Sequence, residues 1–174
     1  GVAACMQALT LLRRLGLAPR RTIRVVLWTN EEFGLRGAHH YAANHAEELP
    51  HHVLAVEMDG GGFAPRGFSF EGADDATLAR AADLATLLAP IGAGGVHAGH
   101  SGADVGALVE RGVLGAGLEV DPTRYFDYHH TEADTLDKVD PADLALDVAA
   151  LAVLAYVVAD LPDRLGGPAA PAAP

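Results

Sequence analysis

The side chains best suited to chemistry lie in three clusters, each at the end of an apolar stretch or in a loop. The first holds two adjacent carboxylates, Glu31 and Glu32, the second holds Asp59, and the third holds the paired imidazoles of His129 and His130. Carboxylates and a neutral imidazole are the oxygen and nitrogen ligands that zinc accepts. A carboxylate beside such ligands can act as a general base toward water. The pattern therefore indicates metal-assisted hydrolysis.

Each cluster also has a plain structural interpretation. A solvated acidic turn would account for Glu31 and Glu32 alone, a turn for Asp59 before its glycines, and a polar loop for the two histidines. Neighbouring side chains diverge, so one glutamate can bind a metal while the other faces a water molecule. Glu57 is an alternative to Asp59, which lies closer to the end of its apolar stretch. Asp134 could orient a histidine ligand from behind.

Strands and helices alternate along the chain and must position these clusters. Strands are predicted at residues 22–29, 53–58, 68–70 and 113–120, and helices at residues 2–15, 37–49, 76–88, 103–110 and 141–160. Residues 91–102 are interpreted as a glycine-rich loop and residues 121–140 as a long polar loop. The first strand is apolar on both faces, which is typical of a central strand. The pattern predicts a three-layer α/β/α sandwich with a mixed, mostly parallel central sheet, whose strand ends carry the clusters.

Length and composition exclude several classes of protein. The 174 residues suit one domain, predicted at residues 1–165, followed by a Pro/Ala/Gly-rich tail at residues 166–174 that we expect to be disordered. With 50% hydrophobic and 20% charged residues, the bulk of the chain is not intrinsically disordered. A net charge of −11 disfavours binding to nucleic acid. No apolar run approaches the roughly 18–20 residues of a membrane span, so none is expected.

Other catalytic motifs are missing from the sequence. There is no H-E-x-x-H, no G-x-S-x-G and no Walker loop. The single cysteine, Cys5, lies in an apolar helical pattern and is interpreted as a small core residue. Most of the other histidines are interpreted as solvated, although His100 lies in a glycine-rich loop that could approach a site, in the run HSGAD at residues 100–104.

Three runs taken together resemble the co-catalytic dizinc aminopeptidase and carboxypeptidase family. They are LWTNEEFGLRG at residues 27–37, MD at residues 58–59 and HTEADT at residues 130–135, within a similarity that extends over residues 1–165. The resemblance implies that Glu31 is the general base and that Glu32 and His130 bind one zinc ion. It also implies that Asp59 binds the second zinc ion and that His129 lies beside the substrate and helps stabilise the oxyanion.

The chain also departs from the family that it resembles. In the family, the first zinc-binding histidine and the bridging aspartate lie upstream of the residues that match residues 1–3. We therefore interpret the chain as the C-terminal portion of a peptidase domain whose N-terminal part is missing. We expect the 174 residues alone not to form a competent dizinc centre. The absent part would carry strands of the same sheet, so an exposed sheet edge is expected.

The predicted function is that of a zinc-dependent exopeptidase acting on short peptides, with two zinc ions in the complete domain. Two alternatives stay open: a non-catalytic peptidase-fold binding module, and a single-zinc glutaminyl cyclase that uses a similar Glu-Glu pair. The resemblance favours a secreted or periplasmic protein and allows a homodimer. Phe63, Tyr125, Phe126 and Tyr128 are candidates for an apolar wall of the substrate pocket, although core packing would account for them equally well.

Overall fold

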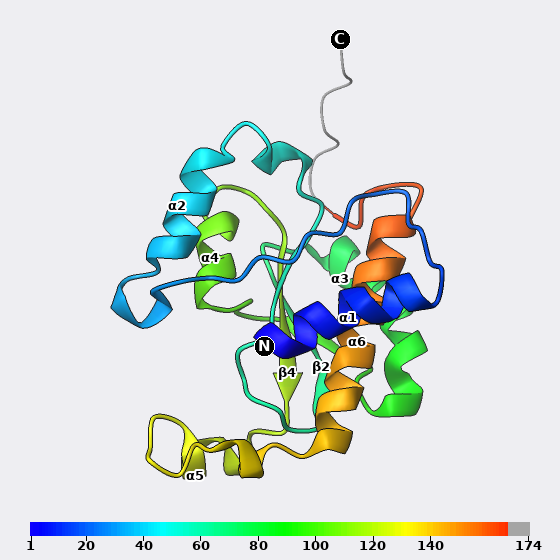
Figure 1. The fold of residues 1–174 in the computed structure, drawn as a ribbon. Coiled ribbons are helices and arrows are strands. Elements are labelled where there is room, and N and C mark those ends of the chain that lie inside the picture. The colour runs from blue at the N-terminus through cyan, green and yellow to red at the C-terminus, as the bar shows by residue number, and fades with distance from the viewer. Residues whose placement is uncertain (167–174) are drawn as a thin grey trace.

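A four-stranded mixed sheet forms the centre of the protein (Figure 1), described here over residues 1–166 of a computed structural model. The strands are β1 (Ala55–Glu57), β2 (Pro65–Glu71), β3 (Gly95–Ala98) and β4 (Gly115–Val120), in the spatial order β1-β4-β2-β3. β1 pairs with β4 and β2 with β3 in parallel, whereas β2 and β4 are antiparallel. The predicted mixed and mostly parallel sheet is confirmed.

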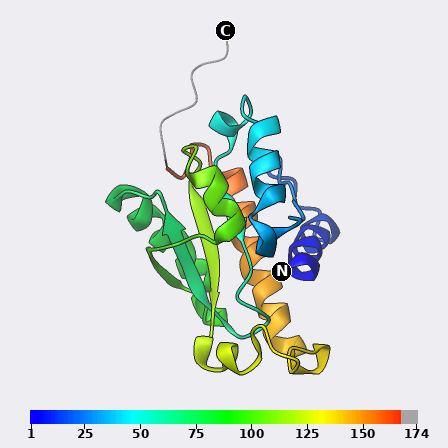
Figure 2. The same ribbon diagram turned by 90° about the vertical axis from the view of Figure 1, so that its left-hand side faces the viewer.

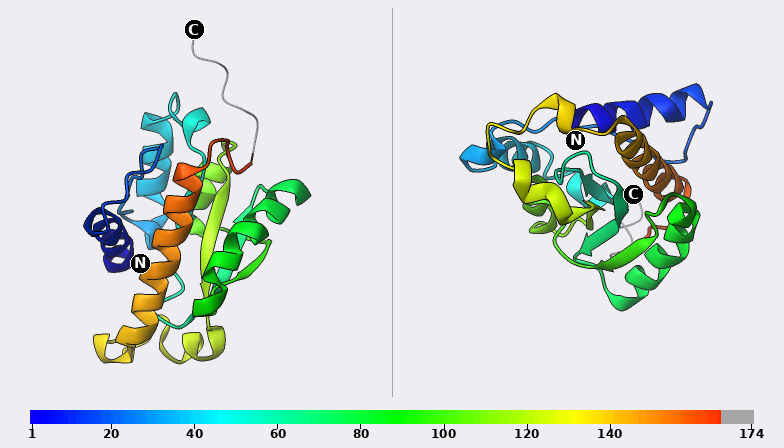
Figure 3. Two further views of the ribbon diagram at one scale, coloured as in Figure 1. Left: turned by 90° about the vertical axis from the view of Figure 1, so that its right-hand side faces the viewer. Right: turned by 90° about the horizontal axis from the view of Figure 1, so that it is seen from below.

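Helices cover both faces of the sheet and complete the three predicted layers (Figures 2 and 3). On one face, α6 (Pro141–Asp160) packs on β2 and contacts both α1 (Val2–Arg14) and α3 (Asp75–Ala85). On the other face, α4 (Ala103–Val109) packs on β1 and β4 and is covered by α2 (Arg36–Asn44). A four-residue helix, α5 (Tyr125–Tyr128), lies at one end of the sheet within the predicted polar loop.

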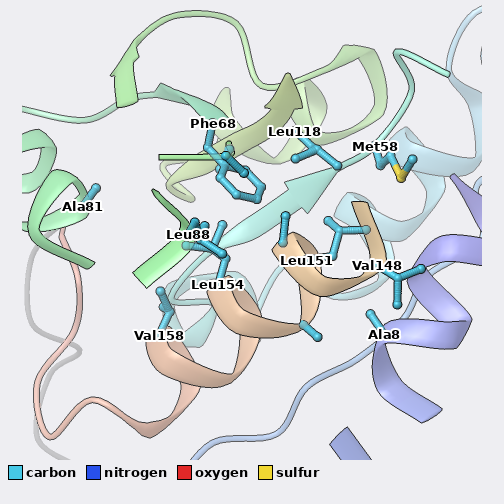
Figure 4. Close-up of a cluster of buried hydrophobic side chains, with 14 of the residues drawn as sticks. Ala8, Met58, Phe68, Ala81, Leu88, Leu118, Val148, Leu151, Leu154 and Val158 are labelled. Atoms are coloured by element: carbon cyan, nitrogen blue, oxygen red, sulfur yellow. The ribbon is translucent and has the colours of Figure 1, made fainter. Parts of the chain in front are cut away.

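The core lies mainly between the sheet and α6 (Figure 4). Phe68 and Phe70, two residues apart on β2, point to the same face because side chains alternate along a strand. They meet Leu88 and Leu154, and all four side chains are almost completely buried. Alanines on α1, α3 and α6 let these helices approach one another closely, so much of the core is built from small side chains.

Helix α6 is more apolar than the sequence analysis allowed for. By length and composition alone its 20 residues would suffice to cross a membrane, contrary to the expectation of no such segment. In the folded chain, 44% of its apolar window is buried, against β2 and α1. Packing within the core therefore accounts for part of its apolarity.

Two predicted elements are wrong. Residues 22–29 are extended but are not a strand, because they form no hydrogen-bonded ladder with the described residues. Conversely, the predicted loop at residues 91–102 contains β3. One of its glycines is needed there: Gly95 approaches Gly67 of β2 so closely that a side chain on either would overlap the backbone of the paired strand. Of the predicted tail at residues 166–174, residues 167–174 lie outside the described residues.

Candidate functional site

A tight turn presents the two adjacent glutamates. Glu31–Phe33 form a single 3₁₀ turn, flanked by Asn30 and Leu35, which both have left-handed backbone conformations with φ of 59° and 54°. Gly37 closes the turn: its N–H donates to the carbonyl oxygen of Thr29 at 2.9 Å, and a Cβ at Gly37 would lie 2.7 Å from the Thr29 nitrogen. Non-glycine residues rarely adopt positive φ, so this turn is strained in the way that functional turns often are.

Glu32 and His130 are brought into contact from distant parts of the chain. Glu32 Oε1 and His130 Nε2 lie 2.7 Å apart, although the residues are 98 positions apart in sequence. Both side chains are more than half exposed, at 62% and 60%. His130 has a φ of 56°, so the structure contains strained backbone on both sides of this contact. Two predicted ligands of one zinc ion therefore converge.

His129 lies in a stack of rings beside His130. Its ring is 3.8 Å from that of His130 and 4.5 Å from that of Tyr125, with both pairs nearly parallel. The stack holds the imidazole of His129 next to the Glu32–His130 contact. Among the residues predicted to form an apolar wall, Phe126 is 82% exposed. The rings of Phe63 and Tyr128 stack on each other with their centroids 6.5 Å apart.

The raised pKa of Tyr125 indicates that the remaining carboxylates lie in this region. Burial is the largest cause of a raised pKa of Tyr125, and the negative charges of Asp59, Glu32 and Glu31 raise it further. All three carboxylates therefore lie within electrostatic range of one phenol. Asp59 is exposed just past the end of β1. The three clusters singled out in the sequence thus meet at one edge of the sheet.

The structure also separates the roles of Glu57 and Asp59. Glu57 is buried at the end of β1 and accepts hydrogen bonds from the backbone N–H groups of Val105 at 2.7 Å and Asp104 at 3.4 Å. Gly102 makes room for this contact, since a Cβ there would overlap the Glu57 carboxylate. Glu57 therefore anchors α4 to β1, which leaves Asp59 as the carboxylate available to a ligand.

Asp104 is a polar residue near the site to which the sequence analysis gave no role. Its side chain is only 5% exposed and its Oδ1 has no hydrogen-bond partner. Burial, together with the negative charges of Glu57, Glu31 and Asp59, raises the pKa of Asp104 to about 6. The sequence signal was an aspartate entering a helix after a glycine-rich loop. In the same loop, the imidazole of His100 accepts a hydrogen bond from the Gly102 N–H at 3.1 Å and so stabilises the conformation of the loop backbone.

The donor atoms present fit part of a zinc centre. Glu32 and His130 offer an oxygen and a nitrogen in mutual contact, which is the ligand chemistry that zinc accepts. Within residues 1–166, no three His, Cys, Asp or Glu side chains are close enough to hold one ion. A catalytic zinc ion normally has about three protein ligands, so these residues fit a site to which further ligands must be added.

Comparisons with known proteins agree with this geometry. The chain is 39% identical over 165 residues to carboxypeptidase Q of Mus musculus and 38% identical to that of Homo sapiens, in each case covering 95% of this chain and 35% of the relative. A crystal structure of a peptidase M28 precursor from Shewanella amazonensis SB2B superimposes with a TM-score of 0.89 at 38% identity, covering 98% of this chain and 38% of that one. The chain therefore spans little more than a third of the length of these relatives.

Family assignment follows from the extent of the match. The model of Peptidase family M28 matches residues 1–157, which is most of the chain. The similarity to carboxypeptidase Q includes the Glu31–Glu32 turn, Asp59 and His130, because it extends over 95% of the sequence. Together with the shared fold, these matches show that the chain belongs to peptidase family M28.

Proposed function

We propose that the chain is the C-terminal portion of a zinc-dependent exopeptidase that hydrolyses peptide bonds of short peptides. The observation that carries the proposal is the 2.7 Å contact between Glu32 Oε1 and His130 Nε2, which joins two potential ligands across 98 residues. Glu31 stands next to this contact, and Asp59 shares the same edge of the sheet. Carboxypeptidase Q and the M28 family supply the reaction class.

Two zinc ions are part of the proposal. Glu32 and His130 would hold one ion and Asp59 the other. When bound, zinc would polarise the peptide carbonyl and lower the pKa of a water molecule. The described residues give too few ligands for either ion, so we propose that the remaining ligands come from other parts of the complete protein. The 174 residues alone are then expected to be inactive.

The two glutamates take different roles because their side chains diverge. Glu32 is engaged by His130, which leaves Glu31 free of that contact. The charge of Glu31 raises the pKa of both Asp104 and Tyr125, so its carboxylate lies within electrostatic range of these two residues. Glu31 is the proposed general base: a carboxylate oxygen accepts the proton of the attacking water and later delivers it to the departing amine. His129, held by the ring stack, is the proposed neighbour of the developing oxyanion.

The experiment compares Glu31→Gln and Glu32→Gln in the full-length protein, with Glu47→Gln as the matched control at an exposed position. Glu31→Gln should retain zinc and lose about 10²–10⁴-fold in kcat on a dipeptide, because it removes the base but not a ligand. Glu32→Gln should lose zinc as measured by metal analysis. The control should change neither quantity. Zinc loss in Glu31→Gln with retention in Glu32→Gln would reverse the two roles.

Two further outcomes would contradict the proposal itself. A zinc-loaded full-length protein that cleaves no dipeptide would favour the binding-module alternative. Cyclisation of an N-terminal glutamine without peptide hydrolysis would favour the cyclase alternative. An assay that offers both a dipeptide and a glutaminyl peptide separates these results in one measurement.

A further inference from the structure

Two segments with little regular structure bring the candidate ligands to the site. One follows β1 and begins with Asp59 and three glycines, Gly60–Gly62. The other follows β4 and carries His129 and His130 just past the four-residue helix α5. Glycine leaves the backbone more freedom than any other residue, and a helix of one turn has little stability of its own. Contacts with neighbouring parts of the chain must therefore fix where these ligands lie.

Asp121 is a residue at which the two segments meet, directly after the last residue of β4. Its backbone N–H donates to the Ala64 carbonyl oxygen at 2.8 Å, at the end of the glycine-rich segment. Its carboxylate accepts hydrogen bonds from Arg66 Nη2 at 2.6 Å, in the first part of β2, and from the Thr123 N–H at 2.9 Å. One residue therefore joins the end of β4, the start of β2 and the turn that leads into α5.

The carboxylate of Asp121 stays charged in this arrangement. The hydrogen bond from Thr123 is the largest cause of a pKa of Asp121 lowered to about 2, and the guanidinium of Arg66 lowers the pKa further. The side chain of Asp121 is 25% exposed and that of Arg66 is 59% exposed. An ion pair so close to solvent adds little to global stability, so its effect is expected in the local geometry.

The path from Asp121 to the histidines is short and continuous. The 3₁₀ turn Pro122–Arg124 runs directly into α5, and Figure 2 shows this unit beyond the end of β4. The His129 N–H donates to the Tyr125 carbonyl oxygen at 2.9 Å, and the two rings stack with centroids 4.5 Å apart. A rotation of the unit about Asp121 would therefore displace His129 and the adjacent His130.

Aromatic contacts join the same two segments farther from Asp121. The rings of Phe63, in the glycine-rich segment, and Tyr128, in α5, stack with centroids 6.5 Å apart. The guanidinium carbon of Arg124 lies 4.9 Å from the centroid of the Tyr128 ring. Ring stacking tolerates sliding and rotation, whereas hydrogen bonds are directional. The bonds of Asp121 are therefore better suited to fix the orientation of α5.

We propose that Asp121 is a positioning residue of the candidate site. It sets the place of Asp59 relative to His129 and His130 by joining the two segments that carry them. It is neither a ligand nor a base, and it acts through the backbone that it holds. The inference rests on the proposed function for its effect on catalysis, but not for its effect on the conformation of residues 122–131.

Kinetics of the full-length protein at saturating zinc give the first test. Asp121→Ala should lower kcat on a dipeptide by about 10–100-fold, as is typical of residues that orient metal ligands, while KM changes little. Asp160→Ala is the matched control, because Asp160 also pairs with an arginine, Arg20, and accepts its backbone N–H. The control should leave kcat unchanged. An unchanged kcat in Asp121→Ala, or an equal loss in the control, would overturn the proposal.

Variants of Arg66 test whether the ion pair is part of the mechanism. Arg66→Ala should also lower kcat, whereas Arg66→Lys should retain most of the activity, because a single Nη2 contact reaches Asp121. The double variant with Asp121→Ala should be no worse than Asp121→Ala alone, since residues in contact do not act additively. Additive losses would show that the two residues act separately and would contradict the proposal.

Hydrogen exchange in the full-length protein tests the positioning role without activity. The amides of His129 and Thr131 donate to the carbonyl oxygens of Tyr125 and Tyr128 at 2.9 and 3.0 Å. In Asp121→Ala they should exchange at least about 10-fold faster, with exchange in α6 unchanged. Unchanged exchange at these amides, or faster exchange throughout the chain, would overturn the proposal. Faster local exchange in a protein that cleaves no peptide even when unaltered would support the positioning role and count against the proposed function.

Discussion

The two sides of the sheet differ in how their backbone edges are satisfied, although one helix packs across both. On one side, β4, β2 and β3 form continuous ladders, and Leu154 of α6 packs on Phe68 and neighbouring core residues. On the other side, β1 and residues 22–28 face a cavity, which Ala155 of the same helix lines. Apolar extended sequence is common to both sides. What differs is whether a neighbouring strand is present. An apolar extended segment therefore becomes a β-strand only where a second strand forms hydrogen bonds with its backbone.

A second contrast lies between the candidate site and the sheet beneath it. Asn30, Leu35 and His130 are the non-glycine residues with positive φ within residues 1–166, and all three lie in or beside the site. Within the four strands of the sheet, only a glycine has a positive φ: Gly67, with φ of 153°, at an irregularity of β2. Strain of this kind persists only when the surroundings hold it in place, so the packed side of the sheet supports the conformation of the site.

The contrast between the two sides predicts that a leucine-to-alanine substitution lowers the free energy of unfolding by very different amounts on each side. Leu154→Ala should lower the free energy of unfolding by about 2–5 kcal/mol, because it empties a close-packed core position. Leu9→Ala, on the cavity wall, should lower the free energy by about 1 kcal/mol or less in the 174-residue chain, because that side chain is only half buried. Urea unfolding of both variants measures the difference. Equal losses would show that the cavity side is packed as well as the other.

The carboxylate of Asp147, on α6 near the start of α1, leads us to expect that the stability of the fold depends on pH. It is fully buried, neither carboxylate oxygen has a hydrogen-bond partner, and burial raises the pKa of Asp147 to about 7. The native state therefore binds this proton more tightly than the unfolded chain, so stability is highest below the ordinary aspartate pKa and falls as pH rises toward 7. Between pH 5 and pH 8 the unaltered chain should lose roughly 2 kcal/mol relative to Asp147→Asn.

Thermal unfolding of both chains across this pH range checks the prediction. Parallel curves for the unaltered chain and the Asp147→Asn variant would mean that the carboxylate has found a partner. The same measurement on the full-length protein sharpens the comparison of the two sides, because a polar group brought in by additional chain would abolish the pH dependence.

The smallest expected effect comes from alanine substitutions at two glycines, one in the site and one outside it. Gly34 and Gly16 have positive φ of 94° and 68°, and a Cβ at either would meet open space. Alanine at either position should lower the free energy of unfolding by about 1 kcal/mol through backbone strain alone. Only Gly34→Ala should also lower kcat/KM of the full-length enzyme, because Gly34 ends the turn that carries Glu31. Equal activity in the two variants would contradict the assigned role of that turn.

Local sequence signals determined the helices and the positions of the chemical groups. The start of α6 follows from Asp140, whose side chain accepts a hydrogen bond from the Ala142 N–H, and from Pro141 at the first helical position. Two of the three clusters were recognisable as carboxylates that follow an apolar extended stretch, and the third as paired histidines in a polar loop. Their assignment to a centre of two zinc ions stays a prediction, which the Glu32–His130 contact supports for one of the ions.

Tertiary structure alone decided which extended segments are strands and which polar groups are structural. β3 escaped notice because its glycine-rich surroundings look like a loop, and only the close approach of Gly95 to Gly67 of β2 explains the glycine at its start. Residues 22–29 have the composition of a central strand yet have no neighbour to pair with among the described residues. Likewise Glu57 and Asp59 are both carboxylates at the end of one predicted strand, but only Glu57 accepts hydrogen bonds from the N–H groups of α4. Composition and periodicity are local properties of the chain, whereas hydrogen-bond pairing and burial depend on residues far away in sequence.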